Sequence, residues 1–181
     1  MRIAPELYLK QLIIGGFERV FEIGKVFRNE GIDSTHNPEF TSLEFYMAYA
    51  DYTDLLTLTE DLFKSLATEL FNGSQQVVIP QWSISDRKTV KALELDLSKP
   101  FQRLDVLTEL GIEAAELSSM DQLRPKLRQK LKMDSAGLND KQLFDRLIET
   151  LIEPKSKSHP AFIMNHPLIM SPLAKSHKQG R

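Results

Sequence analysis

The stretch that most constrains the fold runs from Arg19 to Ala50, where two β-strand patterns flank a long polar loop. The second pattern alternates strictly, as in a half-buried strand, because successive side chains of a strand point to opposite faces. Its odd positions, which predict the face packed on the core, are Thr41, Leu43, Phe45, Met47 and Tyr49. Its even positions include an aromatic ring, a carboxylate and a phenol, at Phe40, Glu44 and Tyr46. We expect that even face to line a ligand site.

The rest of the chain mixes helix and strand patterns, which predicts an α+β fold. We expect an antiparallel β-sheet that carries the site, with helices packed on its other side. Helices are predicted over residues 6–14, from a cap at Asp51 or Thr53 to about residue 71, and over 105–110, 120–132 and 139–152. Further strands are predicted over residues 76–79, 81–85, 92–97, 101–104 and 161–164, with a turn at 86–88. Asn139 with Gln142 forms a capping-box pattern, and Pro125 should lie in a first helical turn or break its helix.

Composition excludes several classes of protein. The chain has 181 residues, room for one domain, and no cysteine, so disulfides and thiolate metal sites are excluded. Its formal net charge of −2 gives no overall basic surface for nucleic acid. No apolar run is long enough to span a bilayer, and no secretory signal opens the chain, so we expect a protein that is not secreted.

The segment RNEGIDSTHNPEFTSLEFYMAYADY resembles motif 2 of the class II aminoacyl-tRNA synthetases, the strand–loop–strand that holds ATP. Within that class it is most similar to the lysyl-tRNA synthetases. The flanking RIAPELYLKQLIIGGFERVFEIGKVF and the distal HPAFIMNHPLIMSPLAKSH resemble the same family. The resemblance implies a class II synthetase-like antiparallel sheet with flanking helices. It also implies a lysine–tRNA ligase, in which ATP converts lysine to lysyl-adenylate and the lysyl group passes to lysine tRNA.

By the same resemblance, both ends of the chain look cut, and residues 1–181 are interpreted as a partial catalytic domain. Residues 1–73 would form the motif 2 region, 74–158 a variable strand and helix segment, and 159–181 the return to the sheet. Motifs 1 and 3 and the anticodon-binding barrel would lie outside, as would the protein ligands of the expected Mg²⁺. The 181 residues alone are therefore expected to be inactive. The resemblance further implies a homodimer, in the cytoplasm or the mitochondrial matrix.

The resemblance assigns five residues of the hairpin to ATP. Arg28 would be the catalytic residue and grip the α-phosphate, where negative charge builds during attack by a carboxylate. Glu30 would hold the nucleotide, although it could equally just pair with Arg28. His36 and Asn37 would lie near the triphosphate and adenine, with a merely solvated His36 as the alternative. Phe40 is well placed to stack on adenine.

Glu44 and Tyr46 carry the argument for lysine. A carboxylate and a phenol on one face suit an ammonium group, and no Lys or Arg occurs between Phe40 and Ala50 to suit an acidic substrate. Tyr46 alone could be a core tyrosine, but that reading leaves Glu44 unexplained. The resemblance assigns Glu6 to the amino group of lysine, and Glu6 could otherwise be a charge favoured at a helix N-terminus.

No metal site is predicted within the chain, because His159, His166 and His177 are widely spaced and two of them adjoin prolines. Two alternatives to a tRNA ligase stay open. A related ligase could lysylate a protein from the same adenylate, or the chain could bind nucleotide or partner proteins without catalysis.

Overall fold

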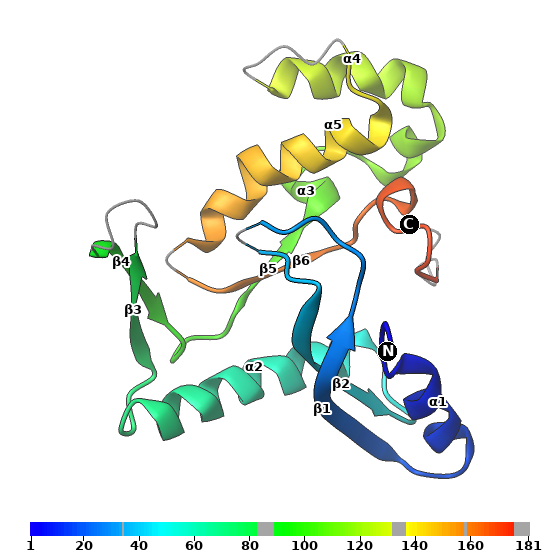
Figure 1. Cartoon of the computed structure of the whole chain (residues 1–181). Coiled ribbons are helices and arrows are strands. Elements are labelled where there is room, and N and C mark those ends of the chain that lie inside the picture. The colour runs from blue at the N-terminus through cyan, green and yellow to red at the C-terminus, as the bar shows by residue number, and fades with distance from the viewer. Residues whose placement is uncertain (34, 83–88, 132–136, 158, 176–181) are drawn as a thin grey trace. The chain divides into compact units, whose positions relative to one another are not determined.

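The structure is a computed structural model that describes residues 1–33, 35–82, 89–131, 137–157 and 159–175, with backbone alone at 81, 82 and 89–91 (Figure 1). The chain divides into two compact units, Met1–Thr57 and Leu58–Arg181. Helix α2 (Tyr52–Leu70) begins in the first unit and continues into the second. Within the described ranges, no helix combines the length and apolarity needed to cross a bilayer.

The first unit consists of helix α1 (Glu6–Ile14) and an antiparallel hairpin of β1 (Arg19–Phe27) and β2 (Glu39–Met47). Helix α1 has the predicted bounds and ends at Gly15, followed by Gly16 with a φ of 105° that a glycine adopts without strain. The register of the hairpin pairs Glu22 with Glu44. The strand–loop–strand predicted from residues 19–50 is therefore confirmed.

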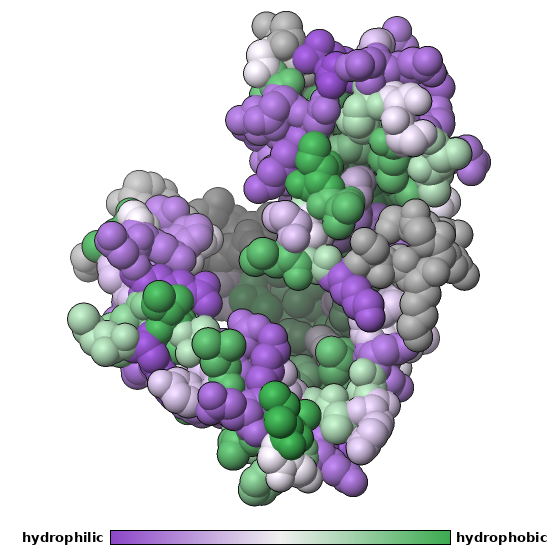
Figure 2. Space-filling model, turned by 90° about the vertical axis from the view of Figure 1, so that its right-hand side faces the viewer, coloured by the Kyte–Doolittle hydropathy of each residue, from purple (hydrophilic) through white to green (hydrophobic). Residues whose placement is uncertain are grey.

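The prediction that the odd-numbered face of β2 packs on the core is wrong for the first unit. Leu43 on that face is 46% exposed, and Phe21, paired with Phe45 in the register, is 70% exposed. Thr41 and Tyr49 on the odd face are exposed as well, and only Phe45 and Met47 of that face are half-buried, whereas Phe40, Glu44 and Tyr46 on the even face are all half-buried. The reason is that the N-terminal segment covers the even face, where the Arg2 side chain lies over Gly24. Exposed apolar residues occur elsewhere on the surface too, and Figure 2 shows apolar residues as green patches between hydrophilic ones in purple.

Helix α2 begins after Asp51, whose carboxylate accepts hydrogen bonds from the amide and the hydroxyl of Thr53 at 2.8 and 2.6 Å. It ends before Asn72 and Gly73, both with positive φ. The predicted cap and stop are thus confirmed.

The next two strands are β3 (Gln76–Trp82) and β4 (Thr89–Asp96), which pair antiparallel. The sequence predicted separate strands over 76–79 and 81–85. Instead, β3 continues through Pro80, which takes a place in the register opposite Ala92. The predicted turn at residues 86–88 lies outside the described residues.

The last two strands, β5 (Gln102–Asp105) and β6 (Ala161–Met164), pair parallel. The α+β class holds. The β1–β2 hairpin is antiparallel, as predicted for the sheet that carries the site residues, whereas this pair is parallel. The described strands form three two-stranded sheets. Between β5 and β6 the chain crosses over through helices, and such a crossover returns a strand in the same direction.

Helices α3 (Val106–Leu110), α4 (Met120–Lys130) and α5 (Asp140–Leu147) build the core of the second unit. A π-helical turn, Ile148–Ile152, extends α5, and short 3₁₀ helices span Ala114–Ser118, Glu153–Ser156 and Leu168–Met170. The side chains with no exposed surface in this core are Val106, Leu127, Leu143, Phe144, Leu147 and Ile152.

Pro125 lies inside α4 without ending it, which corrects the prediction of a first-turn position or a break. Leu123 and Leu127, on either side of the proline, are both buried. Proline costs a helix about 3 kcal/mol, and burial of two leucines contributes a comparable amount in the opposite sense.

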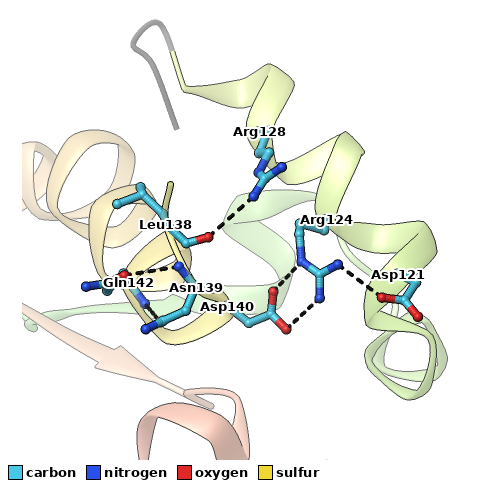
Figure 3. A network of polar contacts seen from close by, with 7 residues as sticks. All are labelled: Asp121, Arg124, Arg128, Leu138, Asn139, Asp140 and Gln142. Atoms are coloured by element: carbon cyan, nitrogen blue, oxygen red, sulfur yellow. Dashed lines mark hydrogen bonds and ion pairs between the residues drawn. The ribbon is translucent and has the colours of Figure 1, made fainter. Parts of the chain in front are cut away.

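A polar network joins α4 to α5 (Figure 3). The Arg124 guanidinium donates two hydrogen bonds to Asp140, at 2.6 and 3.0 Å, and a third to Asp121. Hydrogen bonding to Arg124 lowers the pKa of the Asp140 carboxyl. The predicted capping box is confirmed, because Asn139 and Gln142 exchange hydrogen bonds at 2.9 and 3.0 Å.

The helical core of the second unit gives the first prediction. Replacing Leu127 with alanine should lower the free energy of unfolding by about 2–5 kcal/mol, because the cavity left behind cannot fill. Chemical denaturation followed by circular dichroism measures this change. Leu173→Ala is the matched control, since Leu173 is 100% exposed and should change stability little. Equal effects of the two substitutions would contradict the described core.

Candidate functional site

The loop between β1 and β2 surrounds a cavity of about 430 Å³ within the first unit. The residues that line it are Arg28, Glu30, Asp33, Thr35, His36, Asn37 and Phe40. Five of these seven are the residues that the sequence assigned to ATP, and the structure brings them together around one space. That they bind ATP stays a prediction.

Arg28 lies at the end of β1 with its guanidinium carbon 5.2 Å from the centre of the Phe40 ring. This is cation–π distance. Its Nε donates a long hydrogen bond, 3.4 Å, to the carbonyl of Ile3. The alternative in which Glu30 only neutralises Arg28 finds no support here, because these two described side chains form no ion pair. Their link is a backbone hydrogen bond from the Glu30 amide to the Arg28 carbonyl, 3.0 Å long. The guanidinium can therefore turn toward a phosphate without breaking an ion pair.

Asp33 organises the tip of the loop, and sequence reasoning missed it. Its carboxylate accepts hydrogen bonds from the amides of Thr35 and His36, at 2.7 and 2.8 Å. The Nδ1 of His36 lies 2.9 Å from each Asp33 oxygen. The hydrogen bond from the Thr35 amide, followed by that from the His36 ring, lowers the pKa of Asp33. An ionised Asp33 favours the proton on Nδ1, which leaves Nε2 to face a ligand. The Asx-turn pattern of an aspartate two residues before a threonine was the available signal.

The second group of residues lies further along the same face of β2. The hydroxyl of Tyr46 donates a 3.0 Å hydrogen bond to Glu44. Burial raises the pKa of Tyr46 to about 12, with further contributions from the hydrogen bond and charge of Glu44 and from the charge of Glu6. Tyr46 therefore stays protonated at neutral pH, and the three residues predicted to bind lysine lie within electrostatic reach of one another. Their binding of lysine stays a prediction.

The two groups share one face of the hairpin, since Phe40, Glu44 and Tyr46 all occupy even positions of β2. At the rise of a β-strand, Phe40 and Tyr46 lie about 20 Å apart. One end of the face thus offers a guanidinium and an aromatic ring, and the other a carboxylate and a phenol. This arrangement suits an extended ligand with a phosphate and an aromatic base near one end and a cation at the other.

A larger cavity, about 560 Å³, lies in the second unit between α2, the β3–β4 hairpin and β6. Among the described residues that line it, none is ionisable. Size alone would favour it as a site, but the chemistry favours the hairpin, because an apolar groove cannot stabilise phosphate or ammonium charge.

The described residues hold no group of three or more His, Asp or Glu side chains that could bind a metal ion. The Nε2 of His159 lies at hydrogen-bond distance, 2.9 Å, from the carbonyl oxygen of Pro100. His177 lies outside the described residues. The chain as described therefore offers no protein cluster for Mg²⁺.

Comparison with known proteins gives the family. The family model described as "tRNA synthetases class II (D, K and N)" matches residues 1–181, the whole chain. The chain belongs to the class II tRNA synthetases. The α+β class of the fold agrees with this match.

Individual relatives of this class II synthetase chain carry names that mention lysine. It is 44% identical to a probable cytoplasmic lysine–tRNA ligase of Encephalitozoon cuniculi over 187 aligned residues, which cover 98% of the chain and 36% of the relative. It is 44% identical to a lysine–tRNA ligase of Deinococcus radiodurans, with 98% and 32% covered. For a lysine–tRNA ligase of Aquifex aeolicus the identity is 43%, with 99% and 29% covered. The chain thus spans about a third of the length of these curated relatives.

Proposed function

We propose that the intact protein containing this chain is a lysine–tRNA ligase. The carboxylate of lysine attacks the α-phosphorus of ATP, the bond from that phosphorus to the oxygen bridging the α- and β-phosphates breaks, and pyrophosphate leaves. The lysyl group of the adenylate then passes to the 3′ end of lysine tRNA, with release of AMP. The observation that carries the proposal is the Glu44–Tyr46 hydrogen bond on the face shared with the Arg28–Phe40 pocket.

Arg28 acts on the phosphate in this proposal. Negative charge grows on the α-phosphate oxygens during the attack, and a guanidinium held beside them stabilises it. The ring of Phe40, now covered by Arg28, becomes the stacking surface for adenine when the guanidinium swings to the phosphate. His36, oriented by Asp33, and Asn37 supply hydrogen bonds at the same end, and Glu30 contacts the nucleotide.

Glu44 and Tyr46 select lysine in this proposal. The Glu44 carboxylate accepts a hydrogen bond from the side-chain ammonium of lysine, and Glu6 accepts one from its α-amino group. A substrate without the ammonium leaves the charge of Glu44 without a cation in a half-buried site, a state that costs about 1–3 kcal/mol or more and so gives discrimination. Class II synthetases in general use ATP with Mg²⁺. Among the described residues, no group of three or more His, Asp or Glu side chains could hold the ion.

The same proposal includes three further points. The intact protein is a homodimer, its catalytic domain has the class II antiparallel sheet with flanking helices, and it is located in the cytoplasm or the mitochondrial matrix. Support for the location comes from relatives in Encephalitozoon cuniculi and Enterocytozoon bieneusi, both named cytoplasmic.

Lysine-dependent exchange of pyrophosphate into ATP tests the proposal, followed by charging of lysine tRNA. Exchange that needs lysine, and is not supported by aspartate or asparagine, is the expected result. No exchange with any amino acid would favour a binding protein without catalysis. Exchange without tRNA charging, together with lysylation of a protein, would favour the protein ligase.

A further inference from the structure

Arg2 crosses the even face of β1 at Gly24 and does not line the pocket around Arg28. Its backbone is fixed to the strand, because the amide of Phe27 donates a 2.8 Å hydrogen bond to the Arg2 carbonyl. Its guanidinium forms an ion pair with Glu22. The side chain passes directly over Gly24, where a Cβ would lie 2.6 Å from the Arg2 Nη2 and 3.0 Å from the Glu22 Oε1. The absence of a side chain at Gly24 is what makes room for the ion pair.

Glu22 is also the residue directly opposite Glu44 in the hairpin. Residues that face each other across an antiparallel pair have Cβ atoms about 4.5–5.5 Å apart, and like charges there repel. Both carboxyl groups are half-buried. Without a cation beside Glu22, its carboxylate would repel that of Glu44 and push it out of position. Arg2 is the cation that contacts Glu22.

We propose that Arg2 is a positioning residue of the lysine site: by pairing with Glu22 across Gly24, it cancels the charge opposite Glu44 and keeps the Glu44 carboxylate in its place beside Tyr46 for the ammonium. This inference rests on the proposed function. It adds two residues, Arg2 and Glu22, that act through Glu44 and do not touch the substrate. Glu44 then has two fixed neighbours, the Tyr46 hydroxyl that donates to it and the neutralised Glu22 across the strand.

The polar groups around this part of the hairpin come from four segments of the first unit. The N-terminal segment supplies Arg2, β1 supplies Glu22, β2 supplies Tyr46, and α1 supplies Glu6, which pairs with Lys10. Of these, Arg2 is the cation bound to the carboxylate nearest Glu44 in the register. Lys10 already has Glu6 as its partner and cannot replace Arg2 without leaving Glu6 unpaired.

The test measures the affinity of the intact protein for lysine by calorimetry. With Arg2→Met, the Glu22 carboxylate loses its partner and repels Glu44, which moves away from its position beside Tyr46. We expect lysine affinity to fall about fourfold relative to wild type. Adding Glu22→Gln to Arg2→Met removes the repulsion and should restore the wild-type affinity.

Lys25→Met is the matched control, since it removes a cation from β1 on the face opposite to that of Glu22. The Nζ of Lys25 lies 3.8 Å from Glu39, and its loss should leave lysine affinity unchanged. ATP affinity and thermal melting show that each variant is folded. An unchanged lysine affinity with Arg2→Met, or a loss that Glu22→Gln fails to restore, would overturn the inference. Failure of wild-type protein to bind lysine would instead overturn the proposed function.

Discussion

Arg28→Ala in the intact protein should slow formation of the lysyl-adenylate by about two to three orders of magnitude. The expected loss is large because the guanidinium meets charge that develops mainly in the transition state, so binding of the ground state changes little. Rapid-quench measurement of the first turnover, with saturating ATP and lysine, isolates this step from product release. Lysine affinity should stay within about threefold of wild type.

Two further substitutions sharpen this result. Arg28→Lys keeps the charge but loses the planar fork, and should recover only part of the rate. Lys25→Ala removes a neighbouring cation from the other face of β1 and should leave the rate near normal. A near-normal first turnover in Arg28→Ala would mean that another group holds the phosphate. If only ATP affinity were lost, the role of Arg28 would be its contact with the Phe40 ring and not stabilisation of the phosphate.

Glu44→Gln should weaken lysine binding about 30- to 100-fold, and ATP binding by no more than about threefold. The amide keeps the shape of the side chain and can still accept from Tyr46, but it lacks the charge that faces the ammonium. Separate titrations with lysine and with ATP measure the two affinities.

Tyr46→Phe is the comparison for that variant, because it removes the 3.0 Å hydrogen bond and leaves the carboxylate in place. Its effect on lysine should be smaller than that of Glu44→Gln. Equal losses for lysine and ATP in Glu44→Gln would place Glu44 outside the amino-acid site. An unchanged lysine affinity would leave the carboxylate without the proposed role.

Elements with local causes were predictable from the sequence. Helix α1 follows from its glycine stop, and the capping box at Asn139 and Gln142 opens α5 as expected. The strict alternation in β2 placed Glu44 and Tyr46 on one face, where their hydrogen bond now joins them. Each of these features depends on residues close together in the chain.

Features that depend on distant contacts were not predictable in the same way. Pro125 remains inside α4 while the leucines around it are buried in a core formed with α3 and α5. The parallel pairing of β5 and β6 joins segments separated by more than fifty residues. In the site, Arg2 could be connected with Glu22 only once the N-terminal segment was seen to cross β1 at Gly24. The prediction that the odd face of the hairpin packs on the core was wrong for the same reason. Alternation in a strand separates two faces, but it does not say which of them the rest of the chain covers.

The most direct measurement of the central claim is a structure of the intact protein with a non-hydrolysable analogue of lysyl-adenylate. The account predicts adenine stacked on Phe40, the α-phosphate position beside Arg28, and the lysine ammonium within about 3.2 Å of the Glu44 carboxylate. An analogue bound with its ammonium away from Glu44 and Tyr46, or seated in the apolar cavity of the second unit, would contradict it.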